Sequence, residues 1–225
     1  MTASFRVLLC ALLALTLAAC GETKAPADTA AAPYPEVKQP RDPELADGKV
    51  LVEQFLWLRC VHCWHAEELV NDWARDGFAD NVVFRRVPVV WSPAHAEDAR
   101  YIALANLLLD NRTLDLAGYG KLLEQLFEIT FVKQQPLNEQ TAYEVFRAAG
   151  LYDDDPALFV GELSSMLVIS RVAEAEHLTH QYGINSVPNF VTDGRYLINF
   201  NALAEGAAPS ALLELINGYA AAPQR

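Results

Sequence analysis

Two cysteines three residues apart, Cys60 and Cys63, are the side chains of this sequence best suited to do chemistry. They follow an apolar run at residues 50–58 and precede a helix-like segment at residues 64–75. Side chains three residues apart lie on one face of a helix, so the two sulfurs can close a disulfide on its first turn. A cysteine pair between a strand and a helix is typical of a thiol–disulfide redox site.

The first turn of a helix favours a negative charge on the first of the two sulfurs. Unpaired backbone N–H groups and the positive end of the helix dipole both stabilise a thiolate there, which lowers the pKa of Cys60. His62, between the cysteines, can add a hydrogen-bond donor or a positive charge. Because a stable thiolate stabilises the reduced protein, we expect the disulfide form to act as an oxidant.

Two other interpretations of the cysteine pair are weaker. A structural disulfide across a four-residue loop restrains the unfolded chain very little. A structural zinc ion usually needs four ligands, and only His62 and His65 lie close enough in sequence to complete a crowded set. We therefore predict a redox-active disulfide, with no metal and no other cofactor.

The N-terminus has the features of an exported protein. Residues 1–6 carry one positive charge, and the apolar run at 7–17 is too short to span a bilayer comfortably. It ends in Leu-Ala-Ala-Cys-Gly, which resembles the bacterial lipobox, with Cys20 as the cysteine that is acylated. We predict a signal peptide at 1–19 and a mature protein that is anchored in the bacterial periplasm through lipidated Cys20; an ordinary signal peptide or an uncleaved anchor is the alternative.

The cysteine count fits this processing. Of the four cysteines, Cys10 leaves with the signal peptide and Cys20 is consumed by the lipid. The mature chain then keeps Cys60 and Cys63 as its only thiols, so no other thiol can compete for the redox pair in an oxidising compartment.

The charge balance limits the possible partners. The sequence has 17 basic and 29 acidic side chains, a net charge of −12. Such a chain is a poor binder of nucleic acid and is repelled by anionic lipid surfaces, so membrane attachment depends on the lipid. Residues 20–44 are rich in Ala, Pro and Thr, which predicts a flexible tether after the lipidated cysteine.

Hydrophobic patterning divides the remaining chain into alternating elements. Helix boundaries are marked by Asn138 and Asp155 at predicted starts and by Gly150 and Gly183 at predicted ends, while Asp193-Gly194 marks a hairpin turn. The expected strands are 49–58, 81–90, 187–192 and 195–200, and the expected helices are 63–76, 96–110, 114–129, 138–149, 156–182 and 209–219.

This order of elements, with the cysteine pair at the first strand–helix junction, resembles the DsbA-like thiol–disulfide oxidoreductases. The resemblance rests on Gln54-Phe-Leu-Trp leading to Cys-Val-His-Cys, on Glu67-Glu68, on Leu137-Asn138, and on the stretch at 182–188 that ends in Val-Pro. It implies an α/β protein in which a thioredoxin fold, residues 45–93 and 183–222, carries an all-helical insertion at 94–182.

The resemblance gives Pro188 a role beside the cysteines. The matching proline of thioredoxin-like proteins is cis, and the bend exposes the backbone of Val187 to pair with an extended substrate. The chain departs from the family at Gln54, where a buried Glu is common. Arg86 lies where the family often has Lys, and it stays charged. The residue after Cys60 is Val61 instead of the usual Pro.

We therefore expect an enzyme that donates its Cys60–Cys63 disulfide to reduced substrate proteins during oxidative folding. The resemblance also implies reoxidation by a DsbB-type membrane quinone reductase, and we expect a monomer. A periplasmic reductase or isomerase would use the same cysteines, and a peptide-binding or chaperone module would not need them.

Overall fold

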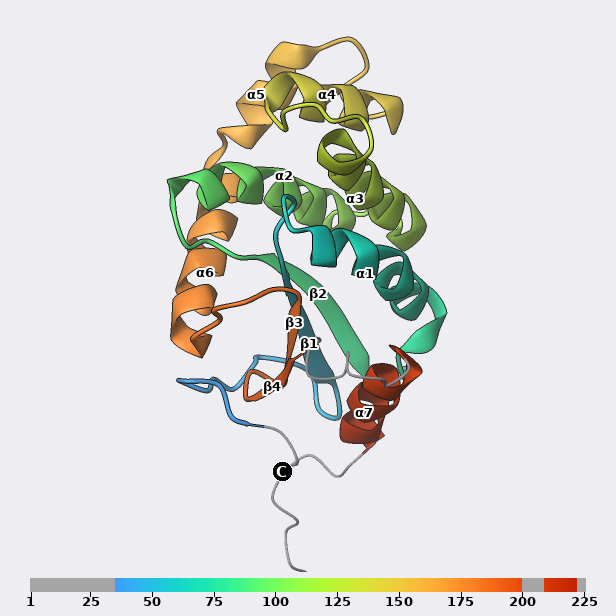
Figure 1. Cartoon of the computed structure of the whole chain (residues 1–225), viewed down its shortest axis with the longest axis vertical. Helices are drawn as coiled ribbons and strands as arrows, with labels where there is room; N and C mark the ends of the chain where they lie inside the picture. The colour runs from blue at the N-terminus through green and yellow to red at the C-terminus, as the bar shows by residue number, and fades with distance from the viewer. Residues whose placement is uncertain (1–34, 200–208, 222–225) are drawn as a thin grey trace, which may run out of the picture. The chain divides into compact units, whose positions relative to one another are not determined.

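A computed structural model describes residues 35–199 and 209–221. Its elements alternate as the sequence patterning predicts (Figure 1). The strands are β1 (Val50–Leu56), β2 (Val82–Pro88), β3 (Asn189–Thr192) and β4 (Tyr196–Asn199), and the helices are α1 (Val61–Asp72), the π-helical turn η1 (Trp73–Gly77), α2 (Pro93–Asp110), α3 (Leu116–Phe131), α4 (Glu139–Ala148), α5 (Pro156–Leu163), α6 (Met166–Tyr182) and α7 (Pro209–Ala221).

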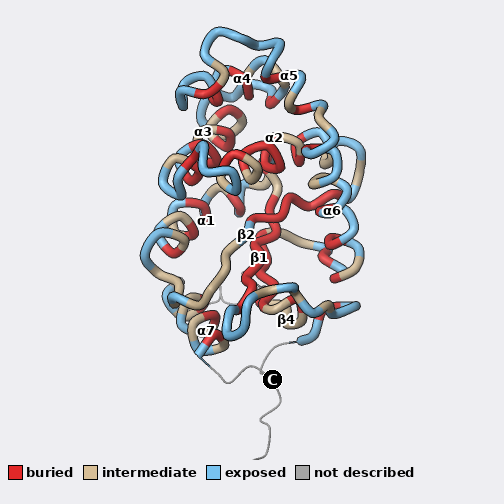
Figure 2. Tube along the Cα trace, turned by 180° about the vertical axis from the view of Figure 1, so that it is seen from behind, coloured by how far each residue is buried: buried red, intermediate tan, exposed pale blue. Residues whose placement is uncertain are grey.

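The four described strands form one sheet in the order β2-β1-β3-β4. β1 runs parallel to β2 and antiparallel to β3, and β3 pairs with β4 across the turn at Asp193-Gly194. Every residue of β1 is buried, because the strand has neighbours on both edges and helices on both faces (Figure 2). This is the thioredoxin fold with a helical insertion, as the sequence predicts.

Alternation along β1 sends its side chains to two different cores. Val50 and Val52 pack with residues of α1, η1 and α7 on one face of the sheet. Phe55 packs with residues of α2 and α6 on the other face. Gln54 therefore points towards α1 and Glu53 towards α6. Of these two buried polar side chains, Gln54 is the one on the side of the sheet that carries the cysteine helix.

The helical insertion has an apolar core of its own. Helices α2 to α5 and the start of α6 enclose large side chains such as Leu123, Phe127, Phe146 and Phe159, all fully buried. Cys63 and Leu58 belong to the same cluster, so the insertion packs directly on the end of β1 and the start of α1.

The helix predicted at 156–182 is two helices. α5 ends at Leu163 and α6 begins at Met166, with a bend of 44° between them. Ser165 causes the break, since its side chain accepts a hydrogen bond from the Val168 N–H and caps α6 in competition with helix continuation. Within the described residues, the bent α5–α6 pair has a length and composition compatible with a membrane span, and no single helix does.

The boundaries of other elements differ by a few residues from the predicted ones. The first helix begins at Val61, two residues earlier than expected, and it passes into a π-helical turn before Gly77. The predicted signal peptide, Cys20 and the strand end at Phe200 lie outside the described residues.

The predicted tether is too long at its C-terminal end. Val37 is buried, its N–H donates to the Arg195 carbonyl, and a β-bridge joins Glu36 to Tyr196. Arg41 pairs with Glu53 at 2.8 Å. Residues 36–41, called the strap from here on, pack on the domain because an apolar side chain and an arginine find buried partners there, which the Ala/Pro-rich composition conceals.

Candidate redox site

The cysteine pair lies at the junction between the end of β1 and the start of α1. After Leu56 a short turn brings Cys60 to the N-cap of α1, with φ −96° and ψ 113°. Its sulfur accepts a hydrogen bond from the backbone N–H of Cys63 at 3.3 Å. Cys60 is half-buried and Cys63 is fully buried, and both are free thiols. The first sulfur is therefore the one that a partner can reach.

The surroundings shift the two thiol pKa values in opposite directions. The hydrogen bond from the Cys63 thiol is the largest influence on Cys60 and lowers its pKa. Backbone N–H groups of Cys63 and His62 and the charge of His62 act in the same direction, against burial, and bring the pKa to about 6. Burial, first of all, raises the pKa of Cys63 strongly. These opposite shifts favour the thiolate at Cys60 and the protonated thiol at Cys63.

The Val187–Pro188 peptide bond is cis, which confirms that prediction. Asn189 pairs with Phe55 of β1, so the loop before β3 lies beside the end of β1. When Cys60 is protonated, its thiol donates to the Val187 carbonyl at 3.7 Å, and Asn189 Nδ2 holds the loop through the Ser186 carbonyl at 2.9 Å. The structure brings Cys60, Cys63, His62 and Val187 together.

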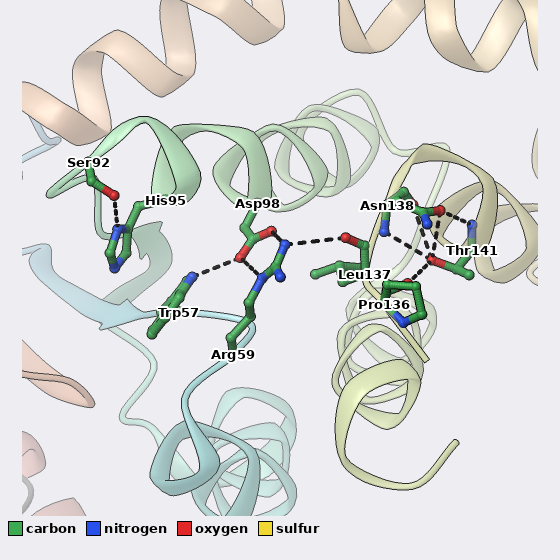
Figure 3. A network of polar contacts seen from close by, with 9 residues as sticks. All are labelled: Trp57, Arg59, Ser92, His95, Asp98, Pro136, Leu137, Asn138 and Thr141. Atoms are coloured by element: carbon green, nitrogen blue, oxygen red, sulfur yellow. Dashed lines mark hydrogen bonds and ion pairs between the residues drawn. The ribbon is translucent and has the colours of Figure 1, made fainter. Parts of the chain in front are cut away.

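A buried carboxylate fixes the turn that precedes Cys60. Asp98 of α2 accepts hydrogen bonds from Trp57 Nε1 at 2.8 Å and from Arg59 Nε and Nη2 at 2.8 and 2.9 Å (Figure 3). Arg59 Nη2 also donates to the Leu137 carbonyl at 3.3 Å. The redox turn is thereby tied to α2 and to the loop that precedes α4.

Two further features lie in the same region of the structure, a capped helix start at α4 and a histidine of α2 between two tryptophans. Asn138 and Thr141 form a capping box at α4, as the predicted helix start requires (Figure 3). The His95 ring packs against Trp57, tilted by 34° with ring centroids 4.4 Å apart, and contacts Trp91 at 5.2 Å. Burial lowers the pKa of His95.

A second polar cluster lies beneath α1. Arg86 pairs with Gln54 in the register of β1 and β2, so both side chains emerge on the α1 face. Arg86 Nη2 is 2.7 Å from Glu67 Oε1, and Arg86 Nε donates to Gln54 Oε1 at 3.1 Å. Both ionic side chains are 1% exposed. Glu53 points to the opposite face and bonds to Arg41 and Tyr182.

Sequence reasoning did not identify Asp98 or the strap, and it used Glu67 only as part of a resemblance. A signal existed for Glu67, since position 67 follows Cys63 by four residues and shares its helix face. No comparable signal marks Asp98, because its partners come from distant parts of the sequence. Among the described residues, no group of three or more His, Cys, Asp or Glu side chains could hold a metal ion.

Comparisons with known proteins agree with this geometry. No protein-family model matches the chain. The thiol:disulfide interchange protein DsbA of Burkholderia cepacia is 27% identical over 186 residues, covering 82% of each chain. Among solved structures, a single-residue variant of Pseudomonas aeruginosa DsbA superposes with a TM-score of 0.68 at 18% identity, over 83% of this chain and 93% of that one. A cysteine-to-serine variant of Proteus mirabilis DsbA, solved with the non-covalently bound peptide PWATCDS, gives 0.64 at 21%, over 83% and 95%.

Proposed function

We propose that the chain is a DsbA-like thiol:disulfide oxidoreductase that donates the Cys60–Cys63 disulfide to reduced proteins during oxidative folding. The opposite environments of the two sulfurs support this proposal best. Cys60 is accessible and ionises easily, while Cys63 is buried and stays protonated. A protein that stabilises one thiolate in its reduced form gives up its disulfide readily.

The reaction proceeds by two thiol–disulfide exchanges. A substrate thiolate attacks Cys60 Sγ, the Cys60–Cys63 bond breaks, and Cys63 leaves with the electron pair and takes up a proton. A second substrate thiolate then attacks the substrate sulfur of the mixed disulfide, and Cys60 leaves as a thiolate. The substrate has lost two electrons and the protein has gained them.

The substrate segment binds beside the cis-proline loop. In this proposal an extended peptide pairs with the backbone of Val187, which lies next to Cys60 and ahead of β3. Main-chain pairing is independent of side-chain identity, which suits an enzyme that acts on many unfolded proteins. The non-covalently bound peptide of the Proteus relative supports peptide binding by a protein of this fold.

Substitution of each cysteine by serine tests the assignment of roles. The oxidised wild-type protein is mixed with a reduced, unfolded protein that contains two cysteines, and the loss of substrate thiols is followed. Cys60→Ser should abolish the transfer. Cys63→Ser, charged at Cys60 with a cysteine peptide, should hold the mixed disulfide without resolving it internally. Oxidation of substrate by Cys60→Ser would contradict the scheme.

The location and the partner of the enzyme are part of the proposal. The N-terminal sequence supports export, with Cys20 lipidated and the domain held at a membrane of the bacterial periplasm. A DsbB-type membrane quinone reductase then restores the disulfide, and the protein works as a monomer. The family resemblance supports such a partner.

Lipidation can be tested in a bacterial host that acylates lipoproteins. The full chain should take up labelled fatty acid and sediment with membranes, and Cys20→Ala should abolish both. Cys10→Ala is the matched control, because residue 10 is removed with the signal peptide and its loss should leave the anchoring unchanged. Labelled, membrane-bound Cys20→Ala protein would contradict the proposal.

A further inference from the structure

Each turn of the redox cycle moves a proton on and off a sulfur that solvent cannot reach. Cys63 is 0% exposed. Its sulfur must gain a proton when the disulfide opens and lose one before the disulfide can reform, because the thiolate is the nucleophile. A group inside the protein is therefore needed to carry this proton, unless the step is to wait for local opening of the helix.

Glu67 is the buried carboxylate on the same face of the helix. Residues four apart on α1 have neighbouring side chains, so Glu67 lies one turn below Cys63. Glu67 is 1% exposed, and its negative charge is one of the influences that raise the pKa of Cys63. The exposed side chain of Glu68 belongs to another face.

The surroundings of Glu67 leave its carboxylate able to take up a proton. The groups that act on it are Arg86 of β2, Gln54 of β1, and Tyr119 and Glu124 of α3. Arg86 forms an ion pair with Glu67, and the side chain of Gln54 also favours the ionised form of this carboxyl group. Within the described residues, neither Glu67 oxygen accepts a hydrogen bond of good geometry. Burial outweighs the effect of Arg86 and raises the pKa of Glu67.

The other buried groups of this cluster cannot do the same work. Gln54 does not titrate, and the guanidinium of Arg86 does not release its proton in this pH range. Glu53 faces the other side of the sheet, where Arg41 and Tyr182 bind it. Glu67 is thus the one titratable carboxyl group that the described structure offers beneath Cys63.

We propose that Glu67 is the proton carrier of Cys63, taking the place of the carboxylate that Gln54 cannot provide. When substrate opens the disulfide, protonated Glu67 gives its proton to the departing Cys63 sulfur and becomes a carboxylate paired with Arg86. On reoxidation, Glu67 takes the proton from Cys63, whose thiolate attacks Cys60 Sγ in the mixed disulfide with the oxidant and expels the oxidant's thiolate. The inference rests on the proposed function.

The oxidation of the reduced protein by oxidised glutathione separates the two steps. At low glutathione the rate reports attack by Cys60, and at saturating glutathione it reports the internal attack by Cys63. Glu67→Gln should slow the saturating rate by at least about tenfold at neutral pH, since general acid–base catalysis contributes roughly 10²–10⁴-fold. The rate at low glutathione should change less than about threefold.

Matched variants separate this role from a structural one. Glu68→Gln removes the same charge from the exposed neighbouring position and should leave both rates unchanged. If Glu67→Gln does not fold, Gln54→Glu combined with Glu67→Gln moves the carboxylate to the other neighbour of Arg86. That double variant should restore the saturating rate to within about tenfold of wild type.

The results that contradict the proton-carrier role differ from the result that contradicts the proposed function. A Glu67→Gln protein whose saturating rate and pH profile equal those of the wild type would overturn the proton-carrier role. So would a folded double variant that resolves the mixed disulfide more than about a hundredfold more slowly than wild type. A wild-type protein that never resolves its glutathione mixed disulfide would instead refute the proposed function itself.

Discussion

Single residues near the N-terminus of α1 decide which sulfur reacts. Cys60 gains hydrogen bonds from the Cys63 thiol and from backbone N–H groups, and it remains half-buried. Cys63, three residues later, has the same chemistry but lies in the apolar core of the insertion. The difference in reactivity therefore comes from position on one helical turn together with the burial of Cys63 against the insertion.

The contribution of His62 to the Cys60 thiolate can be measured directly. Because the pKa of Cys60 is lowered to about 6, the reduced protein should gain thiolate absorbance as pH rises through that value. Loss of the His62 charge in His62→Ala should move the midpoint upwards, and alkylation at pH 6 should slow about two- to fivefold. The measurement is ultraviolet absorbance of the thiolate against pH.

His65→Ala is the control for this titration. His65 is also exposed on the same helix, one turn further from its N-terminus, and its ring packs against Trp64 with centroids 5.1 Å apart. Its removal should leave the Cys60 midpoint in place. If both variants titrate as the wild type does, the histidine between the cysteines has no part in stabilising the thiolate.

At the scale of elements, the strap is the part of the structure most dependent on close backbone contact. Gly194 in the β3–β4 turn has φ +63°, and a Cβ there would lie 2.5 Å from the Arg41 carbonyl oxygen. The Arg41 N–H donates to the Gly194 carbonyl at 3.0 Å. The turn needs glycine both for its left-handed conformation and for the approach of the strap.

Gly194→Ala should release the strap. Arg41 would move, and the buried carboxylate of Glu53 would lose its ion pair. We expect a loss of about 1–3 kcal/mol in the free energy of unfolding, with faster proteolysis at residues 36–41. Urea denaturation and timed digestion measure the two effects.

Gly161→Ala is the matched control for the turn variant. Its Cβ would meet no atom within 4 Å on α5, and alanine favours a helix by up to about 1 kcal/mol. Its stability should equal or exceed that of the wild type. A Gly194→Ala protein with an unchanged strap would show that the close contact is not needed.

Elements and their order were predictable where local pattern and tertiary structure agree. The hairpin at Asp193-Gly194 and the helix start at Asn138 follow from side chains that act on their own backbone. The break at Ser165 was missed because apolar spacing continues through it. The strap was missed because Val37 and Arg41 are stabilised by partners far away in the sequence.

At the scale of the whole molecule, the insertion and the sheet share one redox site. Asp98 and Leu137 of the insertion hold Arg59 (Figure 3). The cis-proline loop of the thioredoxin part lies against Cys60. The spacing of Cys60 and Cys63 predicted the redox pair, and the family resemblance predicted the role of Pro188. Neither could identify the buried ionic contacts around them, which depend on how the two parts pack.

The equilibrium redox potential of the Cys60–Cys63 pair tests the central claim most directly. A soluble protein starting at residue 35 can be equilibrated in glutathione buffers and its free thiols trapped. The low pKa of Cys60 stabilises the reduced form. We therefore predict a potential well above the value of about −270 mV that thioredoxin has. A potential at or below that value would contradict the disulfide-donor account and identify a reductase.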